Sequence, residues 1–212
     1  MKLVIGEYQN FLDYSSLTSE KILSIIENYS LSFSQVRNQM VEWNIHFPMF
    51  IKPFYNYVYH YQTIPNQLDY LNYYLATNVQ YFIEADLDHQ TMLGLAARLY
   101  RTYPSLVRDI HFSTLLKERL HGVVVFYNTQ LDIHNDIDTL IIANNQYYSL
   151  SLFTGTANGR KARAKKVHRH TRFSNVTYIE LPVSFKGSSQ CGDFFLYGNR
   201  ELNLVTQQLL LT

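Results

Sequence analysis

The chain has 212 residues, of which 47% are apolar and 17% charged, and its formal net charge is +1. This composition is typical of a globular protein, because disordered chains have fewer apolar residues and a larger net charge. The single cysteine, Cys191, excludes an intramolecular disulfide and a zinc site built from several cysteines. With no signal peptide and no apolar run long enough to span a membrane, the sequence predicts a soluble, cytoplasmic protein.

The first 97 residues are acidic and rich in tyrosine, and their hydrophobic periodicity is mainly helical. They contain four Lys or Arg against nine Asp or Glu. Helical patterns recur three times, at residues 19–29, 34–44 and 66–76. The aromatic stretch between the second and third patterns is broken up by Pro48, Pro53 and Pro65. We expect residues 1–97 to form a helical region whose aromatic side chains offer a surface to a protein partner.

The first two helical patterns describe either a plain helical hairpin or a helix-turn-helix. The second pattern has only Arg37 as a base and also carries Glu42, which is a poor composition for contact with phosphate. The plain hairpin is therefore favoured.

Residues 98–212 predict a second domain, of the α/β (α+β) class. Helices are expected over 91–100 and 105–120, with a break at Tyr103-Pro104, because proline interrupts helical hydrogen bonding. Alternating or β-branched segments predict strands at 123–128, 136–143, 147–154, 176–183 and 193–198. Asn144-Asn145 is a turn pair, and further helices are expected over 162–170 and 200–211. The resulting α-β-β-β-α-β order indicates a mixed sheet flanked by helices.

The positive charge of the chain is concentrated in one short segment. Between Thr139 and Ile179 there are seven Lys or Arg and no Asp or Glu, whereas the rest of the chain has 11 basic and 17 acidic residues. The seven bases, interspersed with His168 and His170, are Arg160, Lys161, Arg163, Lys165, Lys166, Arg169 and Arg172. Such a segment attracts phosphate, because bases that neutralise phosphates release the counterions condensed on nucleic acid.

Two other interpretations of the basic segment stay open. In the first, its bases pair with acids elsewhere in the fold. In the second, the segment binds a membrane surface, which is disfavoured because the segment has few bulky apolar side chains. His168 and His170 would share a face for a metal only on an extended backbone, and no cysteine is nearby. Among so many positive charges, the two histidines are more simply explained as hydrogen-bond donors to phosphate or as structural residues. The pattern favours nucleic acid, and DNA before RNA, as the partner.

Two acids, Asp136 and Asp138, stand before the apolar part of the second strand. They can hold a hard cation such as Mg²⁺, or they can form a polar turn at the edge of the sheet. With these acids, the order of its elements and the bases after its third strand, the segment of about residues 105–183 resembles the PD-(D/E)XK nuclease superfamily. In that superfamily an Asp of the second strand binds a divalent metal, and the third strand supplies Glu-x-Lys. The resemblance implies a Mg²⁺-dependent DNA endonuclease, in many cases a homodimer.

The resemblance also implies roles for particular residues. Asp138 would bind the metal, together with Asp136 or with Asp109 of the preceding helix. Lys161 or Lys165 would stabilise the charge that develops on the scissile phosphate. The third strand departs from the family, because Ser149 and Ser151 stand where Glu-x-Lys is expected. Either the protein does not hydrolyse phosphodiesters, or the charged groups have moved to the next element.

Three classes of function therefore follow from the sequence. The first is a metal-dependent nuclease that uses Asp138 with Lys161 or Lys165. The second is a catalytically inactive subunit that binds nucleic acid within a larger complex. The third is a scaffold that binds only protein and shows no salt-dependent binding of nucleic acid.

Overall fold

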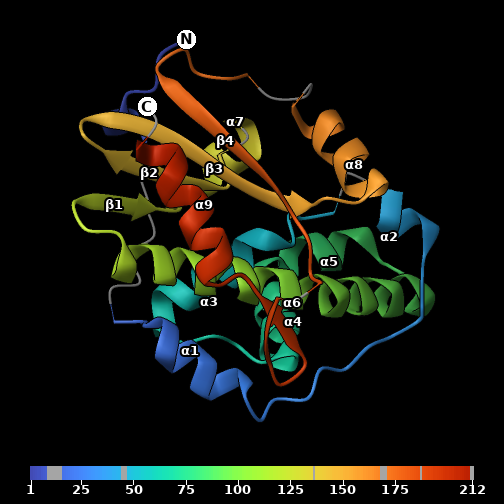
Figure 1. The fold of residues 1–212 in the computed structure, drawn as a ribbon. Helices are drawn as coiled ribbons and strands as arrows, with labels where there is room; N and C mark the ends of the chain where they lie inside the picture. The colour runs from blue at the N-terminus through green and yellow to red at the C-terminus, as the bar shows by residue number, and fades with distance from the viewer. Residues whose placement is uncertain (9–15, 44–46, 136, 168–170, 187, 211–212) are drawn as a thin grey trace. The chain divides into compact units, whose positions relative to one another are not determined.

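The structure of the protein is a computed structural model that describes the chain except for residues 9–15, 44–46, 136, 168–170, 187 and 211–212 (Figure 1). It also leaves undescribed the side chains of residues 43, 158, 162 and 165–167. The chain divides into two compact units. The first, which we call the sheet unit, consists of Met1–Asp13, His111–Gln190 and Phe195–Thr212. The second, the helical unit, consists of Tyr14–Ile110 and Cys191–Phe194.

The division between the two units falls inside one helix, α6 (His89–Arg119). The boundary expected from the sequence, between residues 97 and 98, lies in the same helix. Because α6 is continuous, neither its periodicity nor its composition marks the point where its contacts change from one unit to the other.

The sheet unit confirms the α+β class and the mixed sheet. Its main sheet consists, in spatial order, of β1 (Val123–Phe126), β2 (Thr139–Ala143), β3 (Gln146–Thr154) and β4 (Val176–Val183). The pairs β1–β2 and β2–β3 are antiparallel, and β3–β4 is parallel. Asn144 and Asn145 form the turn between β2 and β3, with left-handed φ angles of 49° and 59° that asparagine tolerates well. Helix α8 (Ala157–Val167) makes the crossover from β3 to β4.

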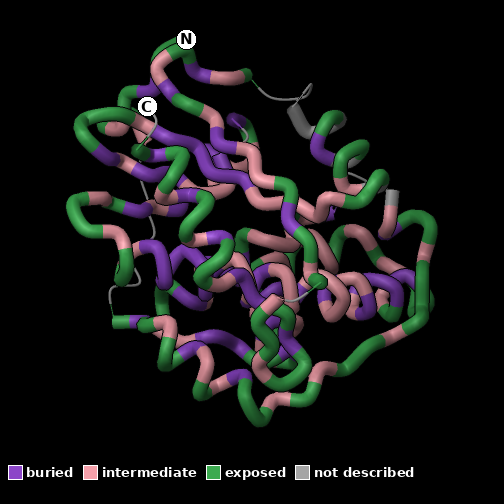
Figure 2. Tube along the Cα trace, viewed as in Figure 1, coloured by how far each residue is buried: buried purple, intermediate pink, exposed green. Residues whose placement is uncertain are grey.

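The two faces of this sheet have different cores. One face packs its apolar residues, among them Ile141, Leu150 and Ile179, against the end of α6 and against α9 (Asn199–Leu210). The other face packs Leu140 and Val176 against α7 (Thr129–Asn135), Phe173 and the N-terminal Leu3. Figure 2 shows buried residues along the inner strands β2 and β3. The sequence did not predict α7, which is a short helix inserted between β1 and β2.

The helical unit contains, in chain order, α1 (Ser19–Ile26), α2 (Gln39–Trp43), α3 (Ile51–Tyr61), α4 (Gln67–Thr77), α5 (Val79–Ala85) and the first part of α6. Several of its tyrosines are core residues and not surface ones: Tyr70, Tyr74 and Tyr103 are buried. Their hydroxyls donate to the backbone carbonyls of Phe50, Pro48 and Pro65. A buried tyrosine needs such a partner for its hydroxyl, so part of the abundant tyrosine serves packing.

Two expectations about proline were wrong. The predicted break at Tyr103-Pro104 is absent, because α6 continues through Pro104. Proline deprives the carbonyl four residues earlier of its helical donor, and here that carbonyl, of Tyr100, accepts a hydrogen bond from the buried side chain of Gln67 at 3.2 Å. Pro53 lies inside α3, but in its first turn, where a backbone N–H has no partner within the helix.

The remaining elements are small. They are a 3₁₀ turn, η1 (Ile5–Glu7), and a two-stranded sheet of β5 (Ser189–Cys191) and β6 (Phe194–Leu196). Helix α2 is shorter than expected, since it begins at Gln39 and not near Ser34. Among the described residues, no helix combines the length and apolar character needed to cross a membrane.

Candidate nucleic-acid interface

A row of polar residues crosses one face of the main sheet. In the register of β3 and β4, Ser151 pairs with Glu180, and Thr139 at the start of β2 pairs with Leu150. Extending the antiparallel β2–β3 register by one residue places Asp138 opposite Ser151. Since paired residues share a face, Asp138, Ser151 and Glu180 lie in line on the face that also carries Leu140 and Val176.

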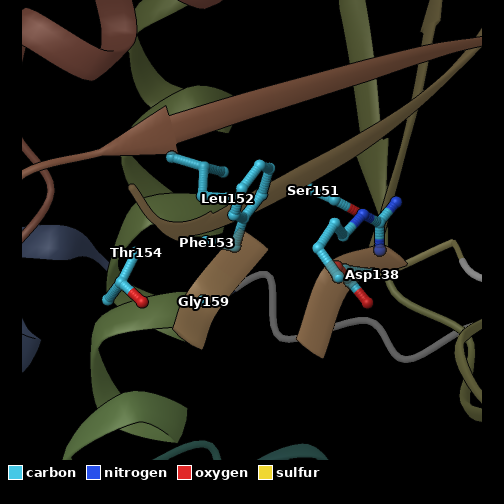
Figure 3. A pocket seen from close by; sticks show the side chains of 7 residues that line it. Asp138, Ser151, Leu152, Phe153, Thr154 and Gly159 are labelled. Atoms are coloured by element: carbon cyan, nitrogen blue, oxygen red, sulfur yellow. The ribbon is translucent and has the colours of Figure 1, made fainter. Parts of the chain in front are cut away.

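A pocket of about 290 Å³ opens beside this row, between β3 and α8. It is lined by Asp138, Ser151, Leu152, Phe153, Thr154, Gly159 and Arg163. Figure 3 shows Leu152 and Phe153 next to each other, with the carboxylate of Asp138 across from them. Gly159 leaves this part of α8 without a side chain, and a Cβ atom there would clash with the Thr154 carbonyl oxygen. Helix α8 can therefore approach the end of β3 closely only with glycine at this position.

Glu180 binds two bases of the basic segment. Its Oε1 lies 3.3 Å from a terminal nitrogen of Arg163 and accepts a hydrogen bond from Arg172. The Arg172 guanidinium also lies over the ring of Tyr178, 4.3 Å from its centre, a cation–π contact. Arg163 is buried, with 7% of its surface exposed. One acid on the edge strand β4 therefore fixes two points of the basic segment, within α8 and after it.

The ionisation of Glu180 reflects this arrangement. Partial burial acts to raise the pKa of its carboxyl group, because burial disfavours the charged form. The hydrogen bonds and positive charges of Arg172 and Arg163 outweigh burial, so the pKa lies below its ordinary value. Glu180 is therefore a carboxylate whose charge is neutralised by two guanidinium groups at neutral pH.

The hydroxyl of Ser151 is the unusual group in the pocket. Ser151 is 2% exposed, and its Oγ has no hydrogen-bond partner within the described part of the chain. An unpartnered buried hydroxyl costs free energy, and such groups in native proteins commonly point to a ligand or a functional role. Ser149, two residues earlier on the same face, is also buried but has a partner.

The N-terminal half of α8 carries two exposed bases. Thr156 caps the helix, since its Oγ1 accepts a hydrogen bond from the Gly159 N–H at 3.1 Å. Arg160 and Lys161 follow in the first turns and are exposed, and the Arg160 Nε donates to the Gly155 carbonyl oxygen at 3.2 Å. This hydrogen bond holds the Arg160 side chain near the loop that joins β3 to α8.

The structure places the other predicted site residues as follows. Asp109 belongs to the helical unit, is about half exposed and lies 3.8 Å from Arg108. Asp136, His168, Arg169 and His170 lie outside the described residues, as do the side chains of Lys165 and Lys166. Of the predicted residues, the pocket therefore brings together Asp138 and Arg163.

The described residues do not form the carboxylate cluster that the resemblance implies for Mg²⁺. No group of three or more His, Cys, Asp or Glu residues in the described part of the chain is placed to share a metal ion. Asp138 reaches the pocket, but the acid next along the polar row, Glu180, is engaged by two arginines. Mg²⁺ is held by one or two carboxylates with water and phosphate oxygens, so the magnesium ion stays a prediction from the resemblance.

Glu180 was not identified from the sequence. It is the first acid after the long acid-free stretch, which is a usable signal. Its pairing with Ser151 depends on the parallel register of β3 and β4 across the α8 crossover, and single-sequence patterns do not specify that register. Ser151 was identified only as a residue that lacks the expected charge.

No family model, curated protein or solved structure matches this chain.

Proposed function

We propose that the chain is a nucleic-acid-binding protein that contacts the phosphate backbone through α8 and the residues that follow it, without hydrolysing it. The observation that carries this proposal is that Glu180 of β4 holds the basic segment in place through Arg163 and Arg172. From residue 157 to residue 180 the chain has seven Lys or Arg and one acid, Glu180, an excess of six positive charges. Glu180 engages Arg163 and Arg172, and Arg160 and Lys161 are exposed.

Among the described residues, Glu180 is an acid that pairs with this segment, through Arg163 and Arg172. Its single carboxylate holds both side chains in place. Nucleic acid would bring negative charge to the exposed bases Arg160 and Lys161, and its binding releases counterions from the phosphates. A fixed basic helix also loses less conformational entropy on binding than a disordered basic tail.

Hydrolysis has less support than binding. Serine hydroxyls occupy both positions where the resemblance expects Glu-x-Lys, and Ser149 and Ser151 are buried. A serine hydroxyl cannot neutralise a metal ion as a carboxylate does. The acid that shares their face, Glu180, is paired with guanidinium groups.

The test is binding of fluorescein-labelled duplex DNA, single-stranded DNA and RNA, measured by anisotropy over a range of salt concentrations. We expect affinity to fall linearly with the logarithm of the salt concentration. In the double variant Arg160→Gln, Lys161→Gln the slope should become shallower by about two on duplex DNA, because roughly one counterion is released per phosphate contact.

The matched control removes two exposed lysines of the same unit that lie outside the basic segment. Lys2→Gln, Lys186→Gln has the same change in charge and should leave the slope unchanged. Equal effects of the two double variants would show that only net charge matters and would contradict the proposal. Incubation with Mg²⁺ or Mn²⁺ tests the rival function: metal-dependent cleavage that disappears in Asp138→Ala would support a nuclease.

A further inference from the structure

The pocket beside α8 has the size and lining of a site for one small planar ligand. Its volume of about 290 Å³ is at the lower end of small-molecule sites, roughly 300 Å³ and above. Phe153 supplies an aromatic ring on the same face of β3 as Ser151, and Gly159 adds no side chain to the lining (Figure 3). A ring system that stacks on Phe153 fits this lining.

The polar groups of the pocket select among ring systems. Asp138 supplies a carboxylate, which only accepts hydrogen bonds, and Arg163 supplies a guanidinium, which only donates them. Ser151 supplies a buried hydroxyl that can do either and has no partner in the described part of the chain. Arg163 contacts Glu180 through one terminal nitrogen, and its guanidinium presents its N–H groups in a planar fork.

A guanine base matches this set of groups. Its N1–H and N2–H₂ are adjacent donors that a single carboxylate accepts together, and its O6 and N7 are acceptors for an arginine or a hydroxyl. Adenine presents an acceptor at N1 and would place it against the Asp138 carboxylate. Cytosine offers one amino group, and thymine one ring N–H, so neither satisfies the carboxylate with two hydrogen bonds.

We infer that this pocket takes one unstacked guanine base of a bound nucleic-acid strand, while α8 holds the phosphates on either side of it. The inference rests on the proposed function, because the strand is brought to the pocket by the exposed bases Arg160 and Lys161. Proteins that bind single strands combine a basic surface with aromatic side chains on which bases stack. Bases that leave a stack are read on their Watson–Crick edge inside a fitted pocket.

The experiment compares three oligothymidylates that differ only in one central base: guanine, inosine or adenine. Inosine lacks the N2 amino group and so removes one of the two hydrogen bonds to Asp138. We expect the guanine strand to bind about tenfold more tightly than the adenine strand, because a bidentate contact to a base is worth roughly 1–3 kcal/mol. The inosine strand should lie between them.

The variants assign the preference to the pocket. Asp138→Asn and Ser151→Ala should each reduce the ratio of the affinity for the guanine strand to the affinity for the adenine strand. Ser149→Ala is the matched control, because it removes a buried hydroxyl from the same strand and face outside the pocket lining. It should leave the preference intact. Thermal unfolding of each variant checks that the fold is retained.

A separate arm uses free guanosine and adenosine, observed by saturation-transfer NMR, since neither carries a phosphate. Guanosine should bind and adenosine should not, and Asp138→Asn should abolish the signal. Equal salt-dependent binding of all three oligonucleotides, without a guanosine signal, would overturn the inference and leave the proposed function standing. No oligonucleotide binding at low salt, with guanosine still bound, would overturn the proposed function and, with it, the assignment of the guanine base to a bound strand.

Discussion

The two faces of the main sheet are built from the same four strands and differ in composition. The face toward α6 and α9 is mainly apolar and carries Val125, Ile141, Leu150 and Ile179 in its core. The opposite face is apolar around Leu140 and Val176, and then changes to the polar row of Asp138, Ser151 and Glu180. A polar row on a covered sheet face costs free energy unless its groups are paired, so the first face contributes more to stability, and we propose that the second contributes to binding.

The first prediction tests the apolar face and has the largest expected effect on stability. Leu150→Ala removes a buried side chain from the middle of the core between the sheet and α9. We expect a loss of about 3 kcal/mol in the free energy of unfolding, from lost burial and from the cavity that remains. Urea denaturation measures it. A loss below that of an exposed substitution such as Leu204→Ala would show that this face is not the stabilising one.

The second prediction concerns the ion pairs of the polar face. Glu180→Gln leaves the buried Arg163 without its carboxylate, and we expect a loss of about 2 kcal/mol, less than for a fully buried pair because Glu180 is partly exposed. Glu7→Gln is the control, an exposed acid of the same unit, and should change stability little. An equally small effect of both substitutions would show that Glu180 does not hold the basic segment.

The third prediction is a pH dependence in two steps. Burial lowers the pKa of His111 below its ordinary 6.5, although the charge of Glu118 opposes the shift. The unfolded chain therefore binds a proton on His111 more readily, and the stability that the neutral imidazole contributes is lost as the pH falls below 6.5. Glu180 has a pKa below its ordinary 4.5, so its contribution is present above pH 4.5 and is lost as the pH falls through its folded-state pKa.

Unfolding in urea at a series of pH values separates the two steps. His111→Gln should remove the fall in stability below pH 6.5, and Glu180→Gln should remove only the step at lower pH. A wild-type stability that stays constant between pH 6.5 and 4.5 would contradict the first step.

The fourth and smallest predicted effect compares two serines on the same strand. Ser149→Ala removes a buried hydroxyl that has a partner, and we expect a loss of about 1 kcal/mol. Ser151→Ala removes a buried hydroxyl with no partner in the described residues, so the change should be near zero or slightly stabilising. Thermal unfolding measures the difference, and an equal loss in both variants would show that Ser151 has a structural partner.

The four strands of the main sheet could be predicted because each strand carries its own pattern. The segment 176–183 matches β4 residue for residue, and Asn144-Asn145 marked the turn between β2 and β3. The helices of the N-terminal half were harder to predict, because the continuity of a helix there depends on groups that are distant in the sequence. Helix α6 passes Pro104 since a side chain from α4, Gln67, satisfies the carbonyl of Tyr100, and no local pattern reveals such a partner.

The candidate site was predicted in part. The charge of the basic segment and the position of Asp138 before a strand are properties of neighbouring residues in the sequence, and so they could be recognised. The place of Ser151 beside Asp138 follows from the β2–β3 hairpin, whose turn fixes its register. The pairing of Glu180 with Arg163 and Arg172 depends on strand register across a crossover. Register of this kind is set by three-dimensional packing.

The most direct test of the central claim is the salt dependence of nucleic-acid binding by the wild-type chain, by Arg160→Gln, Lys161→Gln and by the control Lys2→Gln, Lys186→Gln. We predict steep salt dependence for the wild type and the control, and a slope shallower by about two for the α8 variant. Affinity that does not change with salt, or identical slopes for all three proteins, would contradict the assignment of α8 as the phosphate-binding element.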